Sequence, residues 1–310
     1  APGNRRAHPA WIREPMHSAT HRALRFLIAA CTGCAVMVSG FFGWYLQPLI
    51  SADIEYERLR AFCKPMDPNA IDNRSNSREN GHDAEDAGAP PRLSSELLEN
   101  SRHIDWDALS TINKDVIGWI YVPNTPIDYP IVQAPENDSE KYLRTTFEGS
   151  VAYPNNQGTI YLDSDNADDG LFSSAPVIYG HYQLNGSMLS SFSKNDSVDE
   201  LSRHDQVFLY TPTTMFHVEL FAGNIVDAST EKIKTSFTSR QALASWIKEK
   251  LDESEAVLYR PSSIDQLFTF VTCSYSRWKD QRTLTYGMVI ESASAEAVEY
   301  YSADEPASVD

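Results

Sequence analysis

Residues 267–291, LFTFVTCSYSRWKDQRTLTYGMVIE, contain two β-type runs on either side of a polar segment. Both runs are rich in Val, Phe, Thr and Tyr, which favour strands. The first run ends at Cys273 and Arg282 opens the second, so a hairpin would bring the two strands together. Cations next to a cysteine favour its reactive thiolate, which makes Cys273 a candidate nucleophile. A buried, inert thiol at the end of a core strand is the alternative.

Six more β-type runs precede this stretch. They are IGWIYVP, IDYPIVQ, GTIYLD, PVIYGH, QVFLYTP and MFHVELFAGNIV, bounded by Pro, Gly, Asn and Asp. Eight short strands predict a mainly β domain, either a closed barrel or a sandwich.

Helical spacing interrupts the strands once, in SFTSRQALASWIKEKLDESE between the sixth and seventh runs. Two short helices, SSELLENS and DWDALSTIN, are predicted before the first strand. Asp105 or Asp107 is a suitable cap for the second of them.

Composition excludes several classes of protein. The 310 residues are 42% hydrophobic, which suits a packed core, and the formal net charge of −17 repels nucleic acid. Four cysteines are too few for a disulfide framework. Residues 47–310 contain no P-loop, GxSxG or HExxH motif.

Residues 26–46, FLIAACTGCAVMVSGFFGWYL, are uncharged and long enough to cross a bilayer. Arginines predominate before this segment, at Arg5, Arg6, Arg13, Arg22 and Arg25. The positive-inside rule therefore predicts a cytoplasmic basic tail at residues 1–25, a single-pass signal-anchor helix at 26–46 and an extracellular remainder. A cleaved signal peptide is the alternative.

The exported part divides by composition. Residues 47–93 are predicted to be a linker or stalk, because 65–93 are dense in Asn, Asp, Ser, Gly and Pro. Ile54, Leu59 and Phe62 have helical spacing, and this segment is expected to dock on the following domain. Cys63 closes it as a structural or idle thiol. Residues 94–291 are the predicted catalytic domain, and 292–310 an acidic, flexible tail.

His181 is the candidate partner of Cys273, since it ends the apolar run PVIYGH next to Gly180. Its rivals are His103, His204 and His217, of which the last two are interpreted as packing or surface residues. The 92 residues between His181 and Cys273 mean that only the fold can bring the two together.

An arginine near Cys273 could stabilise an oxyanion during acyl transfer. Arg282 is favoured for this role, and Arg277, in the polar segment, is the alternative. The acidic residues from Asp163 to Asp169 invite a calcium site, but Ala167 occupies a position where an EF-hand needs a ligand oxygen. A weak extracellular calcium site stays open.

Four stretches together, DVIGWIYVPNTPIDYPIVQ, GTIYLDSDN, VIYGHYQLNGSML and FTFVTCSYSRWKDQRTLTYGMVIE, resemble the class B sortases, which are membrane-anchored cysteine transpeptidases. The resemblance covers residues 115–291. It implies an eight-stranded β-barrel with N-terminal helices and a helix between strands 6 and 7. It also implies that His181, Cys273 and Arg282 are catalytic and that no metal or organic cofactor is needed.

The resemblance further implies the partners. A sorting-signal peptide of an exported surface protein or pilin would acylate Cys273, and a peptidoglycan amine or a lysine amine would accept the acyl group. Membrane lipid would surround the N-terminal helix. Class B favours wall anchoring over pilin polymerisation. Val271, where the family commonly has serine, and Tyr182, where asparagine is frequent, leave the peptide preference open.

Two rival functions remain on the sequence alone. One is a membrane-tethered peptide-binding module in which Cys273 is inert. The other is a cysteine hydrolase in which water resolves the acyl-enzyme.

Overall fold

The computed structural model describes residues 16–66, 91–151, 158–273 and 280–302, and the chain divides into two compact units, residues 1–50 and 51–310. The first unit holds most of helix α1 (Met16–Arg60). Within this helix, Arg22–Trp44 is long and apolar enough to cross a membrane. It overlaps the apolar segment predicted at residues 26–46.

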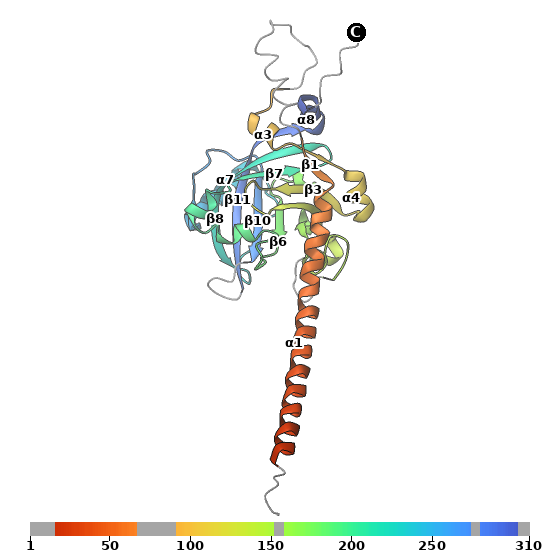
Figure 1. Cartoon of the computed structure of the whole chain (residues 1–310). Helices are drawn as coiled ribbons and strands as arrows, with labels where there is room; N and C mark the ends of the chain where they lie inside the picture. The colour runs from red at the N-terminus through yellow and green to blue at the C-terminus, as the bar shows by residue number, and fades with distance from the viewer. Residues whose placement is uncertain (1–15, 67–90, 152–157, 274–279, 303–310) are drawn as a thin grey trace, which may run out of the picture. The chain divides into compact units, whose positions relative to one another are not determined.

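The second unit is built around a closed eight-stranded barrel (Figure 1). The strand order is β11-β10-β6-β5-β4-β3-β7-β8, and β11 also pairs with β8, which closes the barrel. The strands are β3 (Val116–Tyr121), β4 (Asp128–Gln133), β5 (Ile160–Leu162), β6 (Val177–Gly180), β7 (Gln206–Tyr210), β8 (Thr214–Asp227), β10 (Leu267–Cys273) and β11 (Gln281–Ser294). Each of the eight predicted runs forms one of them, and the barrel alternative is confirmed.

Shorter elements surround the barrel. Two more strand segments pair as β1 (Cys63–Pro65) with β2 (Arg102–Ile104), and β9 (Ala256–Val257) extends the sheet beside β8. The α-helices are α3 (Ser95–Glu99), α4 (Trp106–Ile112), α5 (Lys141–Arg144), α6 (Val198–Leu201), α7 (Arg240–Glu253) and α8 (Ala295–Ser302). The 3-10 turns are η1 (Glu136–Asp138), η2 (Ser164–Asn166), η3 (Gly170–Phe172) and η4 (Ser190–Lys194). Asp105 caps α4 by accepting a hydrogen bond from the Ala108 N–H.

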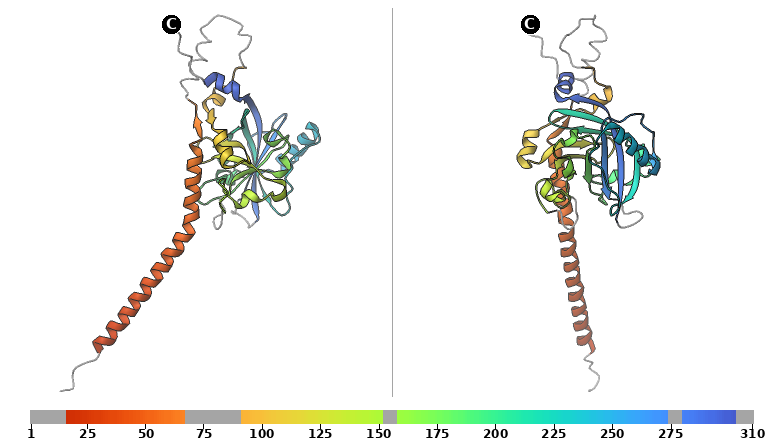
Figure 2. Two further views of the ribbon diagram at one scale, coloured as in Figure 1. Left: turned by 90° about the vertical axis from the view of Figure 1, so that its right-hand side faces the viewer. Right: turned by 180° about the vertical axis from the view of Figure 1, so that it is seen from behind.

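Strand β10 shows how alternation divides the barrel into an inside and an outside. Phe268 and Phe270 belong to the main core, whereas Val271 belongs to a second cluster on the other face. Helix α7 covers that second cluster with Trp246 and Leu251, as its spacing predicts. Helices α4 and α7 lie on opposite sides of the barrel (Figure 2).

The end of α1 belongs to the barrel unit rather than to a linker. Tyr56 and Leu59 are buried, and the Tyr56 ring lies edge-on to Tyr129 with 5.2 Å between centroids. The Tyr56 hydroxyl donates to the Gly158 carbonyl at 2.5 Å. Ile54, expected to dock, is instead 54% exposed. The folded unit thus includes residues before position 94, and residues 67–90 of the predicted stalk at 47–93 lie outside the described residues.

The C-terminal segment also differs from the flexible tail expected from residue 292. Strand β11 continues to Ser294, and α8 follows with Ala297, Val298 and Tyr301 buried in the main core. Three inward-facing residues are enough to hold a short helix whose sequence is otherwise acidic and small. Residues 303–310 lie outside the described part of the chain.

Leu59→Ala is expected to lower the free energy of unfolding by about 3 kcal/mol, because Leu59 is 1% exposed and its loss leaves a cavity. Ile54→Ala is the matched control on the same helix, with an expected change within about 0.5 kcal/mol. Urea unfolding of the full chain in detergent, followed by circular dichroism, measures both. Equal effects of the two substitutions would mean that this end of α1 does not pack as described.

Candidate active site

The pairing register of three neighbouring strands brings together the three residues singled out in the sequence. Cys273, the last residue of β10, lies directly opposite Arg282 of β11, so both side chains are on one face. On its other side β10 runs parallel to β6, with Thr272 opposite Gly180. His181 follows Gly180 and therefore lies at the same end as Cys273.

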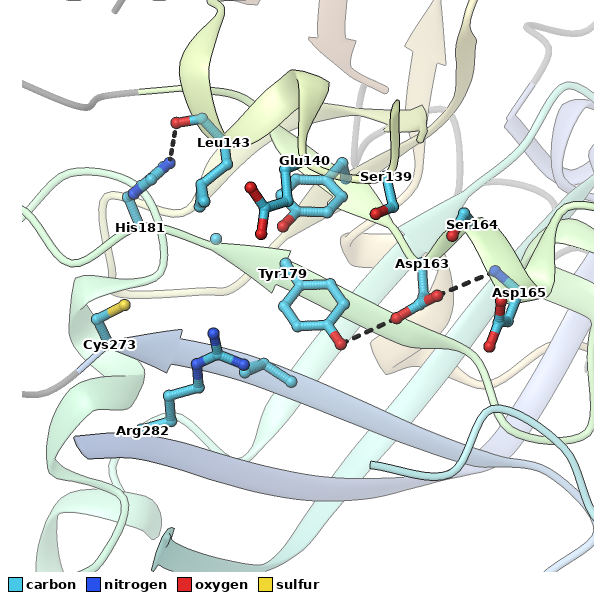
Figure 3. Close-up of a pocket in the computed structure, with 13 residues that line it drawn as sticks. Ser139, Glu140, Leu143, Asp163, Ser164, Asp165, Tyr179, His181, Cys273 and Arg282 are labelled. Atoms are coloured by element: carbon cyan, nitrogen blue, oxygen red, sulfur yellow. Dashed lines mark hydrogen bonds between the residues drawn. The ribbon is translucent and has the colours of Figure 1, made fainter. Parts of the chain in front are cut away.

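A pocket of about 360 Å³ opens between these residues. It is lined by Ser139, Glu140, Leu143, Tyr161, Asp163, Ser164, Asp165, Tyr179, Gly180, His181, Val271, Cys273 and Arg282. Figure 3 shows Cys273 and Arg282 on one side of the hollow and Glu140 and Leu143 on the opposite side. The Cys273 thiol is partly exposed. Arg282 forms no ion pair with any described residue, so its guanidinium is free to bind an incoming oxygen.

His181 is held as a buried, neutral imidazole. Its side chain is 8% exposed, and Nε2 lies 3.0 Å from the Leu143 carbonyl oxygen. A carbonyl can only accept, so Nε2 carries the proton and Nδ1 retains its lone pair. Burial lowers the pKa of His181 to about 4, and the Leu143 carbonyl opposes this shift only in part. The resting site at neutral pH therefore has a histidine that can accept a proton.

Gly158 lies directly against the His181 ring. Its φ is +51°, a region that favours glycine. A Cβ at this position would lie 2.5 Å from His181 Nε2 and 2.6 Å from the Tyr142 carbonyl oxygen. Gly158, two residues before β5, has no side chain and therefore leaves the space that the His181 ring occupies.

Two tyrosines and an aspartate form a wall of the pocket that the sequence patterns did not reveal. Tyr161 of β5 lies opposite Tyr179 of β6, and their rings stack with centroids 5.1 Å apart. The Tyr179 hydroxyl donates to Asp163 Oδ2 at 2.9 Å. Period-2 alternation in GTIYLD places Tyr161 and Asp163 on one face, but it does not indicate that this face lines a pocket.

The acidic run does not form a calcium-type cluster in the structure. Asp163 accepts hydrogen bonds from the Tyr179 hydroxyl and from the Asp165 N–H. Among the described residues, no group of three or more His, Cys, Asp or Glu is arranged to hold a metal ion. The carboxylate of Asp163 instead holds the Tyr179 hydroxyl in place by accepting its hydrogen bond.

The rival histidines lie away from the pocket. His217 is buried with Nε2 2.6 Å from Gln206 Oε1, and His204 Nε2 lies 2.9 Å from Asn195 Oδ1. His103 is exposed on β2. These positions agree with the interpretation of His204 and His217 as packing residues.

The other two groups weighed from the sequence do not enter the site either. Cys63 is buried, and burial together with the nearby Asp128 carboxylate raises the pKa of its thiol to about 12. It is an unreactive thiol at neutral pH. Arg277 lies outside the described residues, so its role as the alternative to Arg282 stays untested.

Known proteins with the same fold are sortases of class B. The chain is 29% identical over 166 residues to sortase B of Listeria monocytogenes, and the match spans 53% of this chain and 65% of that protein, just under two thirds of its length. No family model matches the chain.

Solved structures extend the similarity to the fold. The crystal structure of Clostridium perfringens sortase B has a TM-score of 0.51 and 26% identity, covering 60% of this chain and 99% of that one. The Staphylococcus aureus sortase B-substrate complex has a TM-score of 0.54 and 18% identity, covering 77% of this chain and 96% of that one. The Staphylococcus aureus structure supports the fold alone. The Clostridium perfringens structure supports the fold and is also similar in sequence.

The depressed pKa of His181 predicts a specific pH dependence of stability. The unfolded chain takes up a proton on this histidine below about pH 6.5, whereas the folded chain does so only near pH 4. The contribution to stability is therefore complete above pH 6.5 and is lost as the pH falls toward 4, by up to about 3 kcal/mol. The His181→Gln variant has no imidazole to protonate, so its free energy of unfolding lacks this pH-dependent contribution.

Urea unfolding of the wild-type chain and of His181→Gln at pH 7, 6, 5 and 4 tests the prediction. The wild type is expected to lose stability relative to the variant at each step of acidification. Parallel curves for the two proteins would show that His181 titrates normally in the folded state.

Proposed function

We propose that this chain, which is a class B sortase by sequence and by fold, is a cysteine transpeptidase of the cell envelope. It would cleave a C-terminal sorting motif of exported proteins and join the new carboxyl end to an amine of the cell wall. The observation that carries this proposal is the register that sets Cys273 beside Arg282 and next to His181 at one pocket. The similarity to the Listeria and Clostridium enzymes supports it.

The proposed first half-reaction forms a thioester. The Cys273 sulfur attacks the carbonyl carbon of the scissile peptide bond, and its proton passes to the lone pair of neutral His181. The carbon–nitrogen bond then breaks and the imidazolium returns the proton to the leaving amine. Because the pKa of His181 is lowered to about 4 by burial, the imidazolium is a strong acid and donates readily.

Arg282 is the proposed oxyanion partner. Negative charge develops on the carbonyl oxygen as the thiolate attacks, and a guanidinium that has no described carboxylate partner can stabilise that charge. Arg282 lies opposite Cys273 in the β10–β11 pair, which holds the charge and the nucleophile on one face. In the second half-reaction an acceptor amine attacks the thioester, His181 takes the proton, and an amide forms.

The proposed donor is a sorting peptide, and the Staphylococcus aureus sortase B of the same fold, which was solved as a complex with substrate, supports a substrate site on this fold. The proposed acceptor is an amine of peptidoglycan. This pocket has three carboxylates, Glu140, Asp163 and Asp165, on its lining. Their negative charge favours a cationic amine over a neutral or anionic acceptor.

Substitution of two of the site residues, Cys273 and Arg282, tests the mechanism. Cys273→Ala is expected to abolish formation of the acyl adduct, seen as an increase in intact mass when the full chain is incubated with a library of sorting-type peptides. Arg282→Ala is expected to slow acylation about 100-fold, as loss of an oxyanion donor does in other acyl-transfer enzymes. Arg277→Ala is the comparison variant, and its acylation rate is expected to stay within about twofold of the wild-type rate.

The outcomes separate the rival functions. An adduct that an added amine converts into a new amide supports a transpeptidase, and an adduct released only by water points to a hydrolase. Peptide binding without an adduct points to a binding module. A larger effect of Arg277→Ala than of Arg282→Ala would reassign the oxyanion role.

We also propose that the barrel lies outside the cell, with the basic N-terminus in the cytoplasm and α1 crossing the membrane. The arginines before the apolar segment and the length of Arg22–Trp44 support this orientation. Protease added to intact cells is expected to digest the chain after residue 47 and to leave the N-terminal fragment. Complete protection of the barrel would contradict the proposed topology.

A further inference from the structure

Tyr161 has a hydroxyl group that the site described so far does not use. Its side chain lines the pocket, and the residue is only 6% exposed. No hydrogen bond joins its hydroxyl to any described residue. The hydroxyl is not one of the buried polar atoms that lack a partner, so it is open to the pocket, where a substrate atom can take the place of water.

Tyr179 provides an internal comparison. The two rings stack at 5.1 Å, come from paired positions on β5 and β6, and line the same pocket. The Tyr179 hydroxyl donates to Asp163 Oδ2 at 2.9 Å. The two phenols therefore share their surroundings and differ in one respect, since Tyr179 is bound within the protein and Tyr161 is not.

The position of Tyr161 relative to the reacting groups follows from the sheet. Tyr161 lies opposite Tyr179, which lies opposite Val271 of β10, and Cys273 is two residues further along that strand on the same face. Burial raises the pKa of Tyr161 far above its usual range, and the positive charge of Arg282 opposes this shift while Asp163, Glu140 and Cys273 add to it. The hydroxyl thus lies within electrostatic reach of Cys273 and Arg282, and it stays protonated.

Besides Arg282, the side-chain donors on the pocket lining that are not already bound within the protein are the hydroxyls of Tyr161, Ser139 and Ser164. Glu140, Asp163 and Asp165 are acceptors when ionised, whereas a bound peptide presents carbonyl oxygens that need donors. Arg282 is already assigned to the oxygen of the scissile bond. A protonated phenol on the same face complements the next carbonyl oxygen along the peptide.

We infer that the Tyr161 hydroxyl donates a hydrogen bond to a carbonyl oxygen of the donor peptide, upstream of the scissile bond, and so sets the register of the peptide against Cys273. The inference rests on the proposed function, because it names how that site holds its acyl donor. Arg282 and Tyr161 together would hold two carbonyl oxygens of one extended segment. Tyr161 is thus a specificity residue that binds substrate without taking part in proton transfer.

Tyr161→Phe and Tyr179→Phe in the full chain form a matched pair, because each removes one hydroxyl and retains the stacked ring. Acylation by the most reactive peptide of the library is followed by intact mass over a range of peptide concentrations. For Tyr161→Phe we expect the concentration giving half-maximal rate to rise five- to tenfold, with the maximal rate within twofold, as loss of one neutral hydrogen bond in substrate binding predicts. Tyr179→Phe is expected to raise the half-maximal concentration less than Tyr161→Phe does, because the Tyr179 hydroxyl already donates to Asp163.

Alkylation of Cys273 by iodoacetamide is the readout that does not depend on the peptide, and it should be equal in the wild type and both variants. An unchanged half-maximal concentration for Tyr161→Phe would overturn the inference and leave the transpeptidase proposal intact. The same increase in both variants would also overturn it, because the ring stack rather than the free hydroxyl would then be responsible. A lower maximal rate with unchanged half-maximal concentration would overturn it by assigning the hydroxyl to the transition state.

Failure of the proposed function has a different signature, namely that the wild type forms no adduct with any peptide. Binding of fluorescent peptides to Cys273→Ala, with and without Tyr161→Phe, then decides the inference separately. Weaker binding of the double variant by five- to tenfold supports it. Equal binding, or no binding of any peptide to either protein, overturns it.

Discussion

The pairing register of β10 is the constraint on which the candidate active site depends. Because side chains alternate along a strand, a slip of one residue against β11 would move Cys273 to the barrel interior and expose Thr272 in its place. That slip is opposed by Phe268 and Phe270, which are fully buried in the core and would have to leave it. The free energy that holds Cys273 in position therefore comes from apolar packing on the opposite face of the same strand.

The site combines groups whose electrostatic requirements conflict. Burial keeps His181 neutral, whereas Arg282 has the permanent charge of a guanidinium and is partly exposed, and carboxylates line the same pocket. The structure separates these requirements by depth. His181 packs against Gly158 and the Leu143 carbonyl, whereas Arg282 lies near the end of the β10–β11 pair, opposite Cys273. Such a separation lets one small pocket contain a weak base and a permanent cation without pairing them with each other.

Prediction from sequence succeeded where a residue pattern has a local cause. All eight strands follow from β-type runs, and α7 follows from apolar residues at helical spacing. Sequence spacing could suggest the pairing of His181 with Cys273 but could not establish it, because the pairing depends on the parallel contact between β6 and β10. The family resemblance implied only that the two residues are catalytic together.

Two ordered segments were placed outside the predicted catalytic domain for a different reason. Tyr56 and Leu59 are flanked by charged residues, so the short docked end of α1 has the composition of a linker. Helix α8 depends on three buried side chains in an acidic tail. Tyr161 was missed because a three-residue strand is too short for its alternation to show which face lines a pocket. In each case tertiary burial, rather than local pattern, determines the outcome.

The contact between Gly158 and the His181 ring has a consequence for protein engineering. Residues that connect α5 to β5 invite exchange, since loops usually tolerate changes in length and composition. Any such exchange must nevertheless leave Gly158 in place. A replacement loop that supplies any side chain at position 158 would push a Cβ into the imidazole and the Tyr142 carbonyl, whatever the rest of its sequence. A loop library built on this scaffold should therefore keep the glycine codon at position 158 constant.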